Sequence, residues 1–161
     1  MSIEDQANTS SVLDEIPKID IFSNNTPILC VGVQSDASPA LSELPNFKSI
    51  MKKLDNLPYI KLGDKIEFEL PPEVKESKIK VYDRILFNNG SDKYSTNVIN
   101  IIDVDLADKK VSFNLDENKA AFLSSDLNDY AFGAIIRGFS FSLEINGQKY
   151  LYAFALRTDA S

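Results

Sequence analysis

The C-terminal part of the chain alternates between apolar and polar residues with a period of two, the pattern of a half-buried β-strand. The dipeptide Asn146-Gly147 interrupts this pattern, and Asn-Gly favours a two-residue type I′ turn. Counting outward from the turn gives the predicted cross-strand pairs Ile145–Gln148, Glu144–Lys149, Leu143–Tyr150, Phe141–Tyr152 and Phe139–Phe154. A slip of one residue would turn the aromatic side chains towards solvent, so the sequence predicts a β-hairpin with a fixed register.

The apolar positions change phase upstream of this hairpin. Those between residues 132 and 136 have even numbers, whereas those between 139 and 145 have odd numbers. One extra residue would keep both sets in the core, and the sequence therefore predicts a β-bulge at Arg137-Gly138. Such a bulge either bends the sheet, which is its common use, or presents Arg137 at a functional edge.

Further alternating segments predict a sandwich. They cover residues 29–33, 66–70, 79–87, 102–106 and 111–115, and clusters of Gly, Pro and Asn separate them. In the third segment Asp83 interrupts the apolar face, and Arg84 is expected on the opposite, outward face. Asp108-Lys109 is a predicted tight turn. Strands of this length and spacing indicate a mainly β protein with the fold of an immunoglobulin-like antiparallel β-sandwich.

One segment has helical periodicity instead. Phe47, Ile50, Met51 and Leu54 are spaced i, i+3, i+4 and i+7 and form one apolar stripe. Asn46 is the predicted N-cap. The stripe predicts one short helix that covers an end or edge of a sheet, because such a stripe usually faces the protein's own core.

The first residues differ from the rest of the chain. Residues 1–25 are largely polar and predict a flexible N-terminal tether, with a short edge strand at 17–22 where Ile19 and Ile21 alternate with charged residues. Residues 26–161 form the predicted sandwich domain. The given chain shows no signal peptide. A polar tether before a β domain is typical of a trimmed secreted protein or lipoprotein, and it also occurs in cytosolic proteins.

Composition excludes several functions. The net charge of −7 opposes the positive field that nucleic-acid binding requires, so no nucleic-acid partner is expected. No apolar run reaches the roughly 18 residues of a membrane span, so no transmembrane segment is expected. The chain has no histidine, which removes histidine-based catalysis and the commonest zinc ligand. Its single cysteine, Cys30, cannot form an intrachain disulfide and lies in an apolar run typical of a buried core residue.

The acidic residues give only weak candidate sites. Asp103, Asp105 and Asp108 carry oxygen ligands of the kind that calcium prefers, but two of them fall on the polar face of a predicted strand, where a solvated surface is the simpler interpretation. Paired carboxylates could also serve a small hydrolase, yet no spacing singles out a pair. We assign no catalytic residue and no cofactor, and expect no enzyme.

Four segments resemble a known module. Residues 61–71 and 79–83, together with 137–141 and 150–154, are similar to an immunoglobulin-like β-sandwich found in Gram-positive secreted proteins and lipoproteins. The resemblance implies a sandwich fold and an extracytoplasmic location, secreted or held by a lipid anchor carried in a precursor. It transfers no functional residue.

The sequence therefore predicts a non-catalytic extracytoplasmic domain that binds a protein or small molecule, or that spaces other parts. The alternative is a cytoplasmic structural or binding subunit, and a carboxylate hydrolase comes third. A signal peptide or lipobox in a longer precursor would distinguish the first two. Because Tyr and Arg are enriched at binding hot spots, the predicted binding residues are Tyr59, Tyr82, Tyr94 and Arg137, all expected to be exposed.

Overall fold

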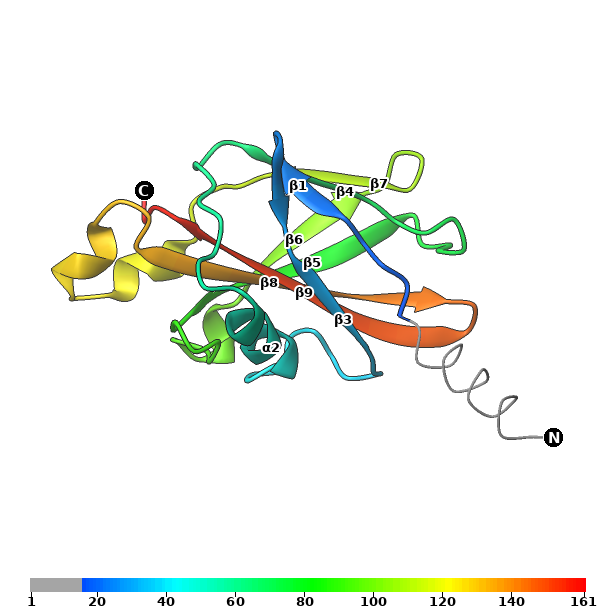
Figure 1. The fold of residues 1–161 in the computed structure, drawn as a ribbon, viewed down its shortest axis with the longest axis horizontal. Helices are drawn as coiled ribbons and strands as arrows, with labels where there is room; N and C mark the ends of the chain where they lie inside the picture. Colours follow the sequence, from blue (N-terminus) through cyan, green and yellow to red (C-terminus); the bar gives the residue numbers. More distant parts are fainter. Residues whose placement is uncertain (1–15) are drawn as a thin grey trace.

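The computed structural model describes residues 16–161, which form two antiparallel β-sheets packed face to face (Figure 1). The four-stranded sheet has the order β2 (Thr26–Ile28), β1 (Ile21–Ser23), β4 (Lys65–Glu69), β7 (Lys110–Asn114). The five-stranded sheet has the order β3 (Cys30–Gln34), β9 (Gln148–Thr158), β8 (Ile135–Ile145), β5 (Lys78–Leu86), β6 (Asn100–Asp105). The prediction of a mainly β sandwich with one short α-helix is confirmed.

The hairpin of β8 and β9 has the predicted register. All five predicted pairs occur, from Phe139 opposite Phe154 to Ile145 opposite Gln148. Asn146 and Gly147 have φ angles of 52° and 79°, as a type I′ turn requires. The inward aromatic residues of this hairpin, with Phe68 of the facing sheet, form the centre of the main core.

The predicted bulge at Arg137-Gly138 is wrong. β8 pairs with β9 without interruption from Ile135 to Ile145, and it also pairs with β5 through both residues. The apolar positions change phase because both faces of β8 are buried at this point. Ile136 lies on the outer face, in a second core that the helix covers, whereas Phe139 faces the sandwich interior.

That helix, α2 (Pro45–Lys53), packs on the outer face of the five-stranded sheet. Phe47 and Ile50 are buried as predicted. The predicted N-cap is wrong, since Leu44 occupies that position and Pro45 begins the helix. Asn46 instead points to the sheet, where its Nδ2 donates to the backbone oxygens of Val31 at 2.9 Å and Leu151 at 3.0 Å.

The predicted outward position of Arg84 is wrong, because this side chain is buried beneath the segment that leads into α2. Its guanidinium donates to the backbone oxygens of Pro39 at 2.5 Å and Leu41 at 2.7 Å, and it forms an ion pair with Asp92 at 3.2 Å. Burial lowers the pKa of Arg84. The prediction failed because it assumed that only one face of this strand is covered.

The described part of the predicted tether belongs to the sandwich. Ile19 and Ile21 are buried in the main core, and β1 lies between β2 and β4 rather than at an edge. The hydroxyl of Tyr152 donates to the backbone oxygen of Pro17 at 2.6 Å and holds the segment before β1. Residues 1–15 of the predicted tether lie outside the described residues.

The chain passes between the sheets on both sides of the sandwich. On one side β2 and β3 are separated only by Leu29 and belong to different sheets. On the other side the predicted turn at Asp108-Lys109 is confirmed by φ angles of 53° and 65°, and it connects β6 to β7 across the sheets. No helix within residues 16–161 is long and apolar enough to cross a membrane.

Candidate functional site

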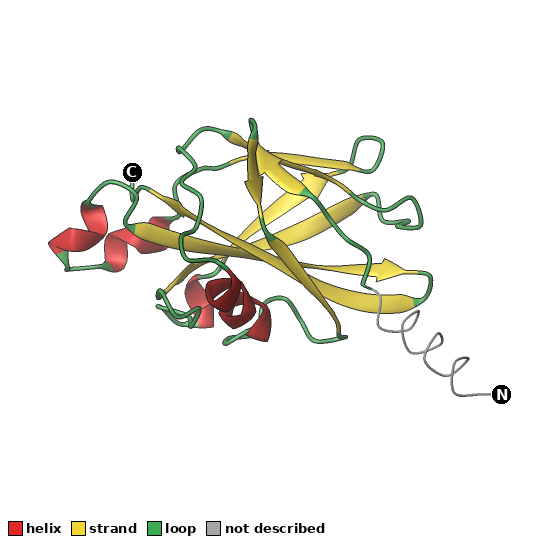
Figure 2. Ribbon diagram, in the orientation of Figure 1, coloured by secondary structure: helices red, strands yellow, loops and turns green. Residues whose placement is uncertain are grey.

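Residues 116–134, which we call the end lobe, project from one end of the sandwich. They connect β7 to β8 and contain two 3₁₀ helices, η2 (Lys119–Leu123) and η3 (Leu127–Tyr130). Figure 2 shows these short helices beyond the end of the hairpin where β8 begins and β9 finishes, with Ile135 paired to Thr158. The lobe therefore extends from β8 and β9, the strands with the longest paired register within residues 16–161.

The end lobe exposes large apolar side chains. Leu127 is 84% exposed and Phe132 is 81% exposed. Of the ten exposed large hydrophobic residues among those described, five lie between positions 122 and 132, namely Phe122, Leu123, Leu127, Tyr130 and Phe132. Single apolar residues are common on protein surfaces, but such a concentration on one short segment makes the end lobe the candidate site of this chain.

One anchor fixes the turn between the two 3₁₀ helices. Lys93, from the segment after β5, forms an ion pair with Asp129 at 2.6 Å. The hydroxyl of Ser124 donates to the same carboxylate at 2.5 Å, and the Tyr130 hydroxyl donates to the backbone oxygen of Ser124 at 2.7 Å. The hydrogen bonds from Lys93 and then Ser124 lower the pKa of Asp129.

A second anchor fixes the segment that enters β8. The carboxylate of Asp159 accepts hydrogen bonds from the backbone nitrogen of Gly133 at 2.8 Å and from the Tyr59 hydroxyl at 2.5 Å. The ring of Tyr59 lies against Phe132, with 4.4 Å between the centroids. The hydrogen bond to Asp159 raises the pKa of Tyr59 to about 12. The exposed Phe132 ring is thus held in place from one side.

Arg137 lies beneath the end lobe, and its predicted exposure is wrong because the side chain is only 2% exposed. Its Nε and Nη2 donate to the two carboxylate oxygens of Asp83, at 3.1 and 2.6 Å. Its Nη1 donates to the backbone oxygen of Asp116 at 2.6 Å. This bidentate ion pair is buried in the sandwich and supports the chain where the lobe begins.

The other predicted binding residues are divided between two places. Tyr59 contacts the end lobe through Phe132, and Tyr94 packs on a small core that includes Ala120 and Ala121 of η2. Tyr82 lies elsewhere, in β5 and opposite Ile101 of β6. The structure therefore brings Tyr59 into contact with the lobe, places Tyr94 against a core that the lobe shares with Ile85, Ile135 and Ala160, and leaves Tyr82 apart from the lobe.

Sequence reasoning missed Leu127 and Phe132. They belong to a segment with neither a period of two nor a helical stripe, and Phe132 was counted among the inward positions of a strand that in fact begins at Ile135. Apolar residues placed among Asn, Asp and Ser without either period were the available indication.

A hollow of about 460 Å³ adjoins the lobe. It is lined by Val98, Ile99, Asn100, Glu117, Asn118, Lys119, Ala120 and Leu123. Asn118 is fixed in this lining, since its side chain donates to the backbone oxygen of Asp83 at 3.3 Å and accepts from the nitrogen of Ala120 at 2.9 Å. The hollow combines apolar walls with one carboxylate and one ammonium group.

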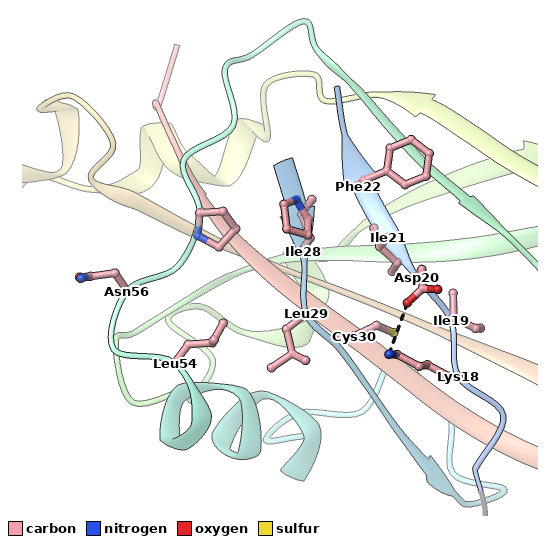
Figure 3. Close-up of a pocket in the computed structure, with 12 residues that line it drawn as sticks. Lys18, Ile19, Asp20, Ile21, Phe22, Ile28, Leu29, Cys30, Leu54 and Asn56 are labelled. Atoms are coloured by element: carbon pink, nitrogen blue, oxygen red, sulfur yellow. Dashed lines mark ion pairs between the residues drawn. The ribbon is translucent and has the colours of Figure 1, made fainter. Parts of the chain in front are cut away.

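A larger groove of about 630 Å³ lies between the β2–β3 segment and residues 54–58 (Figure 3). Much of its apolar lining is already covered, because Ile19, Ile21 and Ile28 are buried in the main core. Cys30 also lines it, and burial raises the pKa of this thiol to about 12, so the thiolate does not form near neutral pH. The exposed ion pair of Lys18 and Asp20, at 3.8 Å, lies at its rim. Of the large hydrophobic residues that line this groove, Phe22 is exposed, to 41%, whereas Leu127 and Phe132 of the end lobe are 84% and 81% exposed.

The acidic residues Asp103, Asp105 and Asp108, which are the weak calcium candidates, are exposed. Asp103 and Asp105 lie on β6 opposite Lys80 and Lys78, and Asp103 forms an ion pair with Lys80 at 3.2 Å. Asp108 lies in the turn before β7. Within residues 16–161, no group of three or more His, Cys, Asp or Glu residues could hold a metal ion.

No family model matches this chain, and neither a curated protein nor a solved structure matches it. The resemblance to immunoglobulin-like modules of Gram-positive secreted proteins therefore stays a prediction.

Proposed function

We propose that this chain is a non-catalytic interaction domain that binds a protein partner through the end lobe. The observation that carries the proposal is the exposure of Leu127 and Phe132 on a segment that is anchored at two points. Binding residues are commonly carried on loops that a rigid scaffold positions. The sandwich serves as that scaffold, and an extracytoplasmic location stays a prediction.

The anchors matter because they reduce the entropy lost on binding. Ordering a flexible loop weakens an interface, whereas a loop held before binding avoids that cost. On one side Lys93 holds Asp129 of the lobe by an ion pair. On the other side Asp159 holds Tyr59, whose ring lies against Phe132 of the lobe. Phe132 and Tyr130 add aromatic side chains, which are frequent among binding hot spots.

A membrane surface is a less favoured partner of the end lobe than a protein. Exposed Phe, Leu and Tyr side chains can enter a lipid interface, but peripheral membrane segments usually place basic residues beside them. The end lobe instead contains four carboxylates and one lysine. An anionic lipid surface would repel these carboxylates.

Site-specific photo-crosslinking in the cells that make the protein tests the proposal. A benzophenone amino acid at Leu127 should give an adduct with one protein, and the same group at Phe22, which is exposed on β1, should not. That protein, purified separately, should bind the unmodified chain and bind the Leu127→Asp/Phe132→Asp variant at least about tenfold more weakly.

Two results would overturn the proposal. One is equal binding of the identified protein by the unmodified chain and the double variant. The other is sedimentation of the unmodified chain with neutral or anionic vesicles, with that sedimentation lost in the double variant, which would replace the protein partner by a membrane.

A further inference from the structure

We propose that the partner surface is basic as well as apolar, and that one of its lysine or arginine side chains enters the hollow beside Glu117. This inference rests on the proposed function and names the chemistry that the end lobe selects. It is carried by the charges around the apolar residues and by the shape of the adjoining hollow.

The end lobe is predominantly acidic. Residues 116–132 contain the acidic residues Asp116, Glu117, Asp126 and Asp129 and a single basic residue, Lys119. Lys93 neutralises Asp129 through its ion pair at 2.6 Å. The side chains of Asp116, Glu117 and Asp126 are exposed, and the described residues form no ion pair with them. The lobe that exposes the apolar residues thus carries three carboxylates without an ion-pair partner within residues 16–161 and one ammonium group, and one of these carboxylates, Asp126, accepts a hydrogen bond from the backbone nitrogen of Asn128 at 2.9 Å.

The hollow beside the lobe has both apolar and charged walls. Val98 and Leu123 are exposed apolar residues on its wall, and Glu117 also lines it. A lysine or arginine side chain has a long apolar stem and a charged head, and it commonly lays the stem along apolar surface while the head stays at a polar group. Val98 and Leu123 fit the stem, and the carboxylate of Glu117 fits the head. Lys119 lines the same hollow and disfavours a cation beside itself, so we place the head at Glu117 and not at Lys119.

The same charges disfavour the other occupants. A second copy of this chain would bring the free carboxylates of two lobes together, and like charges opposed across an interface weaken it. The whole chain carries a net charge of −7, which adds long-range repulsion between copies. A basic partner is attracted by both the local and the overall charge.

The proposal predicts which peptides the lobe selects. A random peptide library displayed on phage is selected on the immobilised full chain, and sequences that also bind the Leu127→Asp/Phe132→Asp variant are discarded. The retained peptides should carry net positive charge together with aromatic or large aliphatic residues. Synthetic copies of these peptides then serve as probes for affinity measurements.

Charge variants of the lobe complete the test. Glu117→Gln should weaken peptide binding by about threefold or more, and Glu73→Gln, at an exposed acidic site on another part of the surface, should leave it unchanged. Raising the salt from about 50 mM to about 500 mM should weaken binding to the unmodified chain more than to Glu117→Gln, because salt screens the removed charge interaction.

The outcomes separate the two proposals. Retained peptides that are neutral or acidic, or equal effects of Glu117→Gln and Glu73→Gln, would overturn the basic partner and leave the end lobe as the binding surface. A library that yields no peptide dependent on Leu127 and Phe132 would overturn both.

Discussion

Asp83 and Arg84 are consecutive residues of β5, and their side chains form buried ion pairs on opposite faces of the same sheet. Asp83 pairs with Arg137 inside the sandwich, and Arg84 pairs with Asp92 beneath the segment that leads into α2. A strand alternates its side chains between two faces, so adjacent buried charges show that both faces are covered here. The five-stranded sheet is therefore the middle layer of this part of the protein.

Removing one partner of the inner pair should destabilise the protein strongly. Arg137→Met leaves the carboxylate of Asp83 buried without its cation, and we expect the free energy of unfolding to fall by about 3–5 kcal/mol. Urea denaturation at neutral pH measures this change.

The double variant Asp83→Leu/Arg137→Met should lose less free energy of unfolding than the sum of the losses in the two single variants. A strictly additive loss would show that the two charges do not depend on each other. Lys80→Met, in the exposed pair with Asp103, is the matched control and should cost less than about 1 kcal/mol.

Replacing Gly147 or Gly138 by alanine should lower the free energy of unfolding, for a different reason at each position. A Cβ at Gly147 would have open space, but its φ of 79° is unfavourable for alanine, and Gly147→Ala should cost about 1–2 kcal/mol. A Cβ at Gly138 would lie 2.6 Å from Cε1 of Phe47, and Gly138→Ala should cost about 1–3 kcal/mol by overpacking. Thermal or urea unfolding measures both. Adding Phe47→Leu should recover part of the loss only for Gly138→Ala, and equal behaviour of the two glycine variants would contradict this distinction.

Asn46 should matter for the docking of α2. Its side chain is buried and donates to the backbone oxygens of Val31 and Leu151. Asn46→Ala leaves both oxygens without this donor, and we expect a loss of about 1–3 kcal/mol in the free energy of unfolding. Hydrogen exchange of the α2 amides should be faster in Asn46→Ala than in the unmodified chain. The amides of the β8–β9 hairpin should show a smaller increase. An unchanged exchange rate in α2 would argue against this role.

The anchor at Asp129 should weaken in acid. Its pKa is lowered in the folded protein, so its stabilising contribution is complete above the unfolded pKa and is lost as the pH falls through the folded pKa. The difference in unfolding free energy between the unmodified chain and Asp129→Asn should therefore shrink from about pH 7 to about pH 3. Denaturant titrations across this range measure it. A difference that stayed constant would show that the charge of Asp129 contributes nothing to stability.

Leu127→Ser/Phe132→Ser should leave the fold intact. Both side chains are largely exposed, and surface substitutions usually change the free energy of unfolding by less than about 0.5 kcal/mol. Binding of an apolar fluorescent dye to the native protein should fall, since the exposed patch is reduced. A large loss of stability would mean that these residues belong to the core, and it would remove them from the proposed binding surface.

The hairpin could be predicted from sequence because its determinants are local. The Asn146-Gly147 turn and the alternation of Phe139, Phe141 and Leu143 define one register, and the structure has it. The second layer could not be predicted in the same way. Arg84 and Ile136 are buried by α2 and its preceding segment, which are distant in sequence. The period-two pattern alone therefore placed Arg84 in solvent and Ile136 in the interior of the sandwich.

The candidate site was only partly accessible to the same reasoning. Asp83 and Arg137 both fall on inward positions of their strands, and two opposite charges facing one core could have suggested an ion pair. Of the tyrosines predicted at a binding surface, Tyr59 contacts the end lobe through Phe132, and Tyr94 packs on a core that includes Ala120 and Ala121 of the lobe. The lobe itself depends on hydrogen bonds between remote residues, such as Gly133 with Asp159, which no local pattern reveals.

The position of β9 within its sheet has a consequence for the order in which the protein can assemble during synthesis. β9 lies between β3 and β8, and Cys30 pairs with Phe154. β3 is translated early, yet it has no partner strand until residues 150–154 leave the ribosome, and the Val31 and Leu151 sites for Asn46 are incomplete until then. During translation the apolar side chains of β3 and α2 therefore remain without their final contacts until β9 has been synthesised. In this interval the nascent chain is most exposed to aggregation.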